Sequence, residues 1–285
     1  MIKFEKLKIK NIAHAKKLIN KCHYAQKENI IIKYAAGTFL EKYTLRRTIY
    51  LIKYNNIYIG IVWIKKINKN ELEIIDIHVE SQYLEKIDLK KVKEKLVVYE
   101  GINNQTLLDI MEKNSFIQIQ NVKLLKKDIV LDENINQDLC ETNINFKPFL
   151  QNRDEELRCS LQNEIFHNED RVPLEESDIF FDEQQSYYID ELSIFIYYNN
   201  LSVGYAQIIK KKGRFFLVNF GILKEFRKLG LGEKFLAHMC NLAYKYEIKE
   251  LYINVDENNL SAINLYMKAG FIYVNNKYAW IKESL

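Results

Sequence analysis

Cysteine is scarce in this chain of 285 residues, and the few cysteines lie far apart, at Cys22, Cys140, Cys159 and Cys240. The sequence contains no Cys-x-x-Cys pair and no Cys/His cluster, so we expect no structural zinc and no other bound metal. Scattered cysteines of this kind are typical of reduced thiols in a cytosolic protein. We therefore expect a cytoplasmic location.

Long apolar runs and a strong net charge are also lacking. Residues 1–8 contain no continuous apolar segment, which argues against a signal peptide, and no run approaches the ~18 apolar residues of a membrane span. The formal net charge is +4, and acidic residues are interspersed among the basic ones almost throughout. This composition does not indicate a nucleic-acid-binding protein. We expect neither a membrane nor a nucleic acid as a partner.

A glycine-containing turn lies between a predicted strand and a predicted helix. Residues 215–222 form a short apolar, aromatic and β-branched run, which predicts a strand. Apolar residues then recur every three or four positions from Phe235 to Tyr246, which predicts a helix. The turn between them contains Arg227, Lys228, Leu229, Gly230, Leu231 and Gly232. Glycine allows positive φ angles, and the unpaired N–H groups of a first helical turn attract anions, so the turn is a candidate pyrophosphate site.

This turn does not match the better-known nucleotide-binding motifs. The P-loop pattern Gly-x-x-x-x-Gly-Lys-Ser/Thr is absent, and Phe235 stands where a dinucleotide fingerprint would have its third glycine. Taken alone, the turn also allows a simpler interpretation, in which the glycines serve packing and the basic side chains are solvated. The residues that follow favour the first interpretation.

A second pattern follows the predicted helix. A strand pattern at residues 251–255 precedes the sequence Asn-Asn-Leu-Ser-Ala-Ile-Asn-Leu-Tyr-Met-Lys-Ala-Gly-Phe at residues 258–271. Within it, Ala262, Leu265 and Tyr266 are spaced to share one face of a helix. The glycine near its end is typical of a helix terminus, and another strand pattern begins directly after it.

The order of strand, Arg-x-x-Gly-x-Gly, helix, strand and Asn-x-x-Ser-Ala-x-x-Leu-Tyr-x-x-x-Gly-Phe resembles the GNAT superfamily of acetyl-CoA-dependent N-acyltransferases. The resemblance covers roughly residues 193–280, and both motifs match at their characteristic spacing. It implies an α/β fold with a central, mostly antiparallel twisted sheet flanked by helices. It also implies an acyltransferase that uses acetyl-CoA as co-substrate and acetylates a primary amine of a small molecule or a protein.

The resemblance also assigns roles to individual residues. The pyrophosphate of the cofactor lies on the glycine turn, and the pantetheine arm follows the preceding strand, where two strands separate and leave backbone groups free. The implied cofactor-binding residues are Phe220, Gly221, Ile222, Arg227, Lys228, Leu229, Gly230, Leu231, Gly232, Glu233 and Asn258. Tyr266 matches the general acid, since a phenol is protonated at neutral pH and can donate to the departing thiolate. Packing alone is the alternative role for Tyr266, and helix entry alone is the alternative for Asn258.

The general base is not identified by the sequence. Asn219 stands where some relatives carry a glutamate, and Glu225 lies in the turn, where a solvated acid would look the same. Deprotonation of the amine through ordered water is a further alternative. Residues 163–173, with His167 and several carboxylates, are expected to line the acceptor side. His238 falls within the helix pattern and is expected to be structural.

The chain contains an internal repeat of this pattern, in agreement with the two domains that its length suggests. Residues 54–60 match residues 198–204, and residues 103–117 align with residues 258–272. Eleven residues are missing between these stretches in the first copy, where the second copy has its strand, glycine turn and helix. In their place, residues 80–85 contain two acids and no glycine. Biased composition is the alternative explanation of the similarity.

The two copies therefore predict two domains with different roles. Residues 1–133 form a degenerate GNAT-like domain without the cofactor turn, and residues 144–285 form the catalytic domain, with a polar linker between them. Tyr266 aligns with Met111, so the first copy lacks the general acid as well. We expect one active site per chain, in a monomer or a homodimer. Two alternatives stay open: a non-catalytic CoA-binding sensor or scaffold, and a transferase that uses a longer acyl-CoA or an aminoacyl-tRNA.

Overall fold

The structure, a computed structural model, describes residues 2–21, 38–69, 71–87, 89, 96–102, 105–130, 143–167 and 171–283. The chain divides into two compact units. The first unit contains Met1–Val122 and Asn275–Leu285, and the second contains Lys123–Val274. The polar linker predicted between residues 133 and 144 lies almost wholly outside the described residues, as do Cys22 and Cys140.

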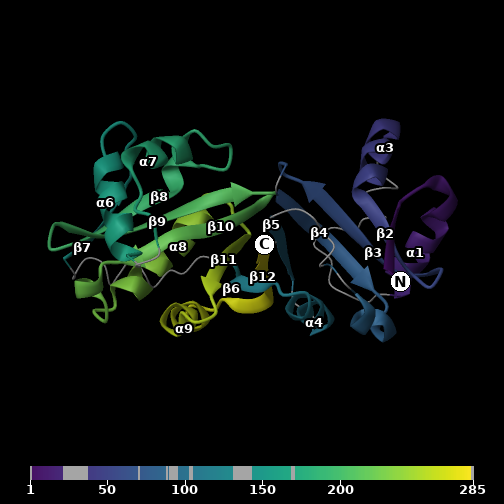
Figure 1. The fold of residues 1–285 in the computed structure, drawn as a ribbon. Coiled ribbons are helices and arrows are strands. Elements are labelled where there is room, and N and C mark those ends of the chain that lie inside the picture. Colours follow the sequence, from purple (N-terminus) through teal and green to yellow (C-terminus); the bar gives the residue numbers. More distant parts are fainter. Residues whose placement is uncertain are drawn as a thin grey trace. The chain divides into compact units, whose positions relative to one another are not determined.

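The first unit is built on a sheet with the strand order β1-β2-β3-β4-β5-β12. Its strands are β1 (Ile2–Lys6), β2 (Ile49–Tyr54), β3 (Ile57–Lys66), β4 (Glu71–Val79), β5 (Leu96–Ile102) and β12 (Ile272–Glu283). Its described helices are α1 (Ile12–Lys21), α3 (Phe39–Thr48) and α4 (Gln105–Lys113). Only the described pairing of β4 with β5 is parallel; the other pairs are antiparallel. Figure 1 gives the course of the chain.

The last strand of the chain lies mostly in the first unit. β12 pairs antiparallel with β5, with Lys277 opposite Ile102 and Glu283 opposite Leu96. This pairing places Tyr278 and Trp280 in an apolar cluster of the first unit. The predicted catalytic domain 144–285 includes this strand, whereas the compact units place residues 275–285 with the first copy. The domain boundaries therefore stay a prediction.

The second unit has the strand order β11-β10-β9-β8-β7. These strands are β7 (Ile144–Pro148), β8 (Ser193–Tyr198), β9 (Leu201–Lys211), β10 (Arg214–Ile222) and β11 (Glu250–Asp256), and β6 (Ile117–Asp128) ends in this unit. The helices are α6 (Glu155–Ile165), α7 (Glu176–Glu183), α8 (Leu231–Lys245) and α9 (Leu260–Lys268). Figure 1 shows α6 and α7 on one side of the strands and α8 on the other.

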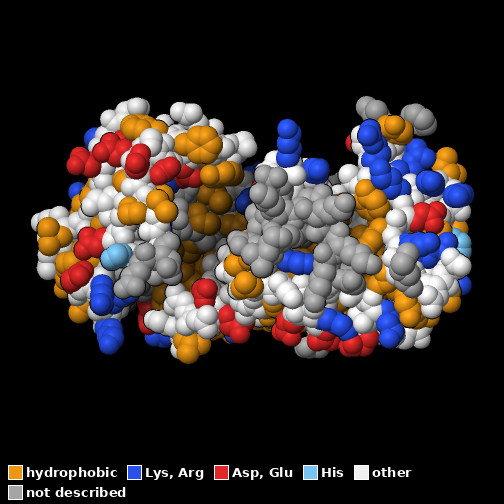
Figure 2. Space-filling view, viewed as in Figure 1, with side chains coloured by type: hydrophobic (Ala, Val, Ile, Leu, Met, Phe, Trp, Pro, Cys, Tyr) orange, Lys and Arg blue, Asp and Glu red, His pale blue; other side chains and the backbone are white. Residues whose placement is uncertain are grey.

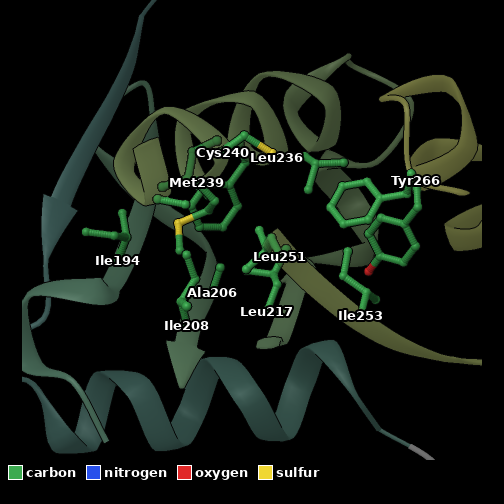
Figure 3. Packing of buried hydrophobic residues seen from close by; sticks show 14 of the residues in the cluster. Ile194, Ala206, Ile208, Leu217, Leu236, Met239, Cys240, Leu251, Ile253 and Tyr266 are labelled. Carbon is green, nitrogen blue, oxygen red and sulfur yellow. The ribbon is translucent and has the colours of Figure 1, made fainter. Parts of the chain in front are cut away.

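Each face of this sheet carries its own apolar core. Under α8, the positions Phe235, Leu236 and Met239 are fully buried, because the three- and four-residue spacing of apolar residues turns one helix face to the strands. They pack against Leu217 and Leu251 in one apolar cluster, and Figure 3 shows part of this cluster. The opposite face packs against α6 and α7 through a separate cluster that includes Phe149, Leu161, Ile179, Phe195 and Tyr205. The mixed α/β fold predicted from the sequence is confirmed.

The predicted internal repeat is visible in the backbone of the two units. Both matched hairpins turn through two asparagines with positive φ, Asn55 and Asn56 in the first copy and Asn199 and Asn200 in the second. The strand register shifts after Ile52 in one copy and after Ile196 in the other, at the same offset. Helices α4 and α9 coincide end to end in the alignment, and the second residue after each helix has positive φ, with Ser115 at 62° and Gly270 at 86°.

The copies differ in the connection that follows strand β4 in the first copy and strand β10 in the second. Only residues 80–95 separate β4 from β5, whereas residues 223–249 separate β10 from β11. In the first copy, the described part of this connection holds a short 3₁₀ helix (Ser81–Lys86) and no counterpart of α8. The described residues of the first copy therefore show no counterpart of the long helix, and residues 80–95 contain no glycine.

Candidate active site

Strands β10 and β11 pair over only part of their length. The parallel register runs from Phe215 opposite Leu251 to Leu217 opposite Ile253 and then stops. On the other side of β10, the register with β9 shifts between Val218 and Gly221. Asn219, within this bulge, has a φ of +53°. The backbone of β10 beyond Leu217 therefore faces open space where β11 would otherwise continue the ladder.

A cavity of about 760 Å³ lies at this separation of the strands. Its walls come from the ends of β10 and β11, the turn before α8, helix α9 and the end of α6. Of the residues predicted from the sequence, it is lined by Phe220, Gly221, Ile222, Arg227, Lys228, Gly230, Gly232, Glu233 and Tyr266. Gly232 and Tyr266, from two motifs and thirty-four positions apart in the chain, thus meet at one cavity.

Three predicted cofactor-binding residues lie outside the cavity wall. Leu231 is buried in the core beneath α8, and Leu229 is exposed. The backbone N–H of Asn258 donates to Asp256 Oδ1 at 2.8 Å, which closes a turn ahead of α9. The next residue, Asn259, lines the cavity instead, and its side chain caps the helix by accepting from the N–H of Ala262 at 3.1 Å. A helix starting at Leu260 requires its cap one residue earlier, which is the signal that would have selected Asn259.

The glycine turn ends in an exposed helix N-terminus. Gly230 is the N-cap of α8 and has a φ of +76°, and Lys228 also has positive φ. Since Lys234 donates to the carbonyl of Gly230, the N–H groups of the residues between them have no partner within the helix. A Cβ built on Gly230 meets no described atom within 4 Å. The turn thus offers free donors and the positive end of a helix dipole to open space.

Arg227 uses its guanidinium to hold the turn in place. Its Nε donates to the carbonyl of Ile222 at 2.9 Å, and its Nη2 donates to the carbonyl of Ile165 at 3.2 Å. These bonds join the end of β10 to the end of α6 across one edge of the cavity. The sequence had placed Arg227 with the cofactor-binding residues as a positive charge beside the anion. The structure adds a second task for this side chain, bracing the cavity wall.

Tyr266 lines the cavity from helix α9. It is only 6% exposed, and its ring packs at 6.0 Å from that of Phe220 and at 5.9 Å from that of Phe271. Burial raises the pKa of Tyr266 to about 12, so the phenol is protonated at neutral pH. Figure 3 shows its oxygen beside Ile253, where the β10–β11 ladder ends. A proton donor therefore stands at the point where the strands separate.

The end of α6 closes the other side of the cavity. Ile165 and Phe166 line it, and a Cβ on Gly221 would overlap Cγ2 of Ile165, so only glycine fits there without movement of its neighbour. Of residues 163–173, which the sequence predicts on this side, Ile165 and Phe166 line the cavity and His167 does not; residues 168–170 lie outside the described residues. The possible base Glu225 does not line it either. His238 stacks on Phe146 at 3.9 Å.

A buried polar network backs the cavity on the α6–α7 side of the sheet. Arg158, 1% exposed, pairs with Asp182 and donates to Gln207 Oε1 at 3.0 Å. Gln207 in turn bonds Asn219, which lines the cavity. No sequence motif pointed to Arg158, Asp182 or Gln207, because they lie far apart in the chain.

Neither a metal centre nor a membrane-spanning helix is found among the described residues. They contain no group of three or more His, Cys, Asp or Glu side chains arranged to hold a metal ion. None of the described helices combines the length and the apolar character needed to cross a membrane.

Known proteins resemble the chain at the levels of sequence and fold. The model of the Acetyltransferase (GNAT) family matches residues 154–271. A probable spermine N(1)-acetyltransferase from Bacillus subtilis subsp. natto is 34% identical over 102 residues, which cover 31% of this chain and 67% of that protein. N-alpha-acetyltransferase 50 from Danio rerio is 30% identical over 100 residues, and the match covers 33% of this chain and 60% of that relative.

The structural likeness extends over the whole chain. The crystal structure of a GCN5-related N-acetyltransferase from Sphaerobacter thermophilus superposes with a TM-score of 0.60 at 14% identity, covering 99% of this chain and 95% of the other. This likeness concerns the fold. The family model, by contrast, matches a stretch that holds the glycine turn and Tyr266. The chain belongs to the GNAT family of acetyltransferases.

Proposed function

We propose that the second unit is an acetyl-CoA-dependent N-acetyltransferase that transfers an acetyl group to a primary amine by direct attack. The observation that carries the proposal is the cavity where β10 and β11 separate, which has an anion-binding helix start at one wall and Tyr266 at another. The first unit, whose copy lacks both features, contributes no second active site.

The residues of the cavity fit the parts of this co-substrate. The N–H groups at the start of α8, next to Gly230 and Gly232, would hold the pyrophosphate, and Lys228 would add positive charge. The backbone of β10 at Phe220 and Gly221, on the side that β11 leaves unpaired, would bond the pantetheine arm. When bound, acetyl-CoA supplies the thioester that the amine attacks.

Each catalytic task then has a candidate group in the wall. A backbone N–H near Ile222 would stabilise the negative charge that develops on the carbonyl oxygen. Tyr266 would donate its proton to the thiolate as it leaves, and its raised pKa keeps that proton available at neutral pH. No cysteine lines the cavity among the described residues, in accord with direct attack without an acyl-enzyme.

The acceptor is proposed to be an amine that is positively charged in solution. Relatives are named for spermine N(1)-acetylation and for N-alpha-acetylation, which are both reactions of primary amines. Exposed acidic residues, among them Glu175, Glu176 and Asp178, lie at the start of α7, and Figure 2 shows red side chains gathered over this part of the second unit. Such a surface attracts cationic amines electrostatically.

A thiol-release assay with acetyl-CoA tests the proposal, with spermine, spermidine and a peptide with a free N-terminus as acceptors. We expect release of CoA with at least one of them. Binding of acetyl-CoA without release for any amine would favour a CoA-binding sensor, and no binding at all would reject the cofactor site.

Gly230→Leu provides the matched test of the turn, with Gly213→Leu as its control. Both glycines have a φ of +76°, and a Cβ on either meets no described atom within 4 Å, so the backbone strain of the two substitutions is alike. Only Gly230 lines the cavity. We expect Gly230→Leu to weaken acetyl-CoA binding at least tenfold and Gly213→Leu to leave it unchanged. Equal effects would mean that the turn does not contact the cofactor.

A further inference from the structure

The buried polar network of the second unit ends at the cavity wall, at Asn219. The Nη2 of Arg158 pairs with Asp182 and donates to Gln207 Oε1 at 3.0 Å. Gln207 Nε2 donates to Asp182 Oδ2 at 3.2 Å, and Asn219 Nδ2 donates to Gln207 Oε1 at 3.3 Å. The network thus connects a fully buried cation to a side chain that lines the cavity.

The charges at the buried end decide how each amide in this network is turned. A guanidinium has only donors and a carboxylate has only acceptors, so the Gln207 oxygen must face Arg158 and its nitrogen must face Asp182. The hydroxyl of Tyr205 also donates to that oxygen, at 3.1 Å. The opposite rotamer would set donor against donor and acceptor against acceptor. Because Gln207 therefore presents its oxygen to Asn219, the Asn219 amide must point its nitrogen at Gln207 and its oxygen away.

The same side chain lines the cavity from the bulge of β10. Asn219 occupies the bulge of β10 with a φ of +53°, a conformation that asparagine tolerates better than most residues. It lies where β10 has already separated from β11. Among the described residues, no donor bonds its Oδ1. The cavity is thus lined by a hydrogen-bond acceptor whose orientation is fixed by its bond to Gln207.

We infer that Asn219 holds the acceptor amine, its Oδ1 accepting a hydrogen bond from the amine nitrogen, and that Gln207, Arg158 and Asp182 are the residues that position it. The inference rests on the proposed function. An oriented carbonyl oxygen selects a donor such as an amine and rejects a carboxylate. It also bonds a neutral amine without the strong preference for the ammonium form that a carboxylate would impose. A neutral amine is the form able to attack the thioester.

Asn219→Gly is the direct test, with Asn200→Gly as its matched control. Glycine accepts the positive φ of either position, and Asn200, at 64°, lies on the exposed β8–β9 turn. The assay uses whichever of spermine, spermidine and the free N-terminal peptide the wild type acetylates fastest. A hydrogen bond to a charged or polarised group accounts for about tenfold or more in binding, so we expect Asn219→Gly to raise the amine KM by at least that factor. The acetyl-CoA affinity of Asn219→Gly should stay at the wild-type value. For Asn200→Gly, both the amine KM and the acetyl-CoA affinity should stay at wild-type values.

A double-mutant cycle separates positioning from a general structural effect. Gln207→Met removes the oxygen that orients Asn219, so it should raise the amine KM alone but add nothing in the Asn219→Gly background. Thermal melting and acetyl-CoA binding report whether each variant is folded. An unchanged amine KM in Asn219→Gly, or additive effects in the cycle, would overturn the inference while the proposed function stands. Absence of acetyl-CoA binding or of any amine acetylation by the wild type would reject the proposed function, and the inference with it.

Discussion

Replacing Tyr266 with phenylalanine removes one hydroxyl from the cavity wall and little else. The ring contacts with Phe220 and Phe271 are retained, and no described residue bonds the hydroxyl. The expected change in the free energy of unfolding at pH 7 is therefore within about 1 kcal/mol, and urea denaturation measures it. A large loss of stability would mean that the hydroxyl has a structural partner.

The expected change in turnover is much larger. A positioned general acid contributes about 10²- to 10⁴-fold, so we expect kcat of Tyr266→Phe to fall by at least 100-fold with an unchanged acetyl-CoA affinity. Stopped-flow or steady-state thiol release measures kcat, and calorimetry measures the affinity. The control is Tyr99→Phe, which removes a buried hydroxyl from the first unit and should leave kcat unchanged.

The pH dependence gives a second measure of the same residue. Burial raises the pKa of Tyr266 to about 12 from the usual 10, so the phenol favours folding below pH 10, and this contribution is lost as pH rises from 10 to 12. Tyr266→Phe should therefore lose less stability than the wild type in that window.

A kcat of Tyr266→Phe within threefold of wild type would remove Tyr266 from the mechanism and would leave protonation of the thiolate to solvent.

Three further predictions concern the surroundings of the cavity. Gly221→Ala should cost about 1–3 kcal/mol in thermal unfolding because its Cβ overlaps Ile165 Cγ2, and adding Ile165→Leu, which lacks that branch, should recover part of the loss; no recovery would contradict the contact. Burial lowers the pKa of His238 to about 4, so its contribution is present above pH 6.5 and is lost as pH falls toward 4. His238→Phe should then melt above the wild type only at acidic pH, and parallel melting profiles would contradict this. Arg158→Met should destabilise by about 3–5 kcal/mol in urea because Asp182 loses its cation, and a loss below 1 kcal/mol would count against the network.

Local patterns were enough to predict the parts of the site that lie close together in the sequence. The glycine turn, helix α8 and the helix bearing Tyr266 follow from spacing and from the conformational freedom of Gly230. Asn258, for which helix entry was the alternative role, is not the cap of α9, because the Asp256 carboxylate forms a turn with Asn258 and leaves the cap to Asn259.

Contacts between distant residues had no local signal. Arg227 braces the cavity through the carbonyl of Ile165, sixty-two positions earlier, and the charged partners of Gln207 come from two separate helices. The placement of residues 275–285 with the first unit also depends on which strand they pair with. A strand pattern predicts extended backbone but does not identify its neighbour.

The central claim is that the chain has one cofactor site, in the second unit. Calorimetric titration of the full chain with acetyl-CoA tests it most directly, because the stoichiometry counts sites without knowledge of the acceptor. The account predicts one acetyl-CoA per chain and the loss of that binding in Gly230→Leu. Two bound molecules per chain would show that the first copy retains a site, and no binding would contradict the cofactor site in the second.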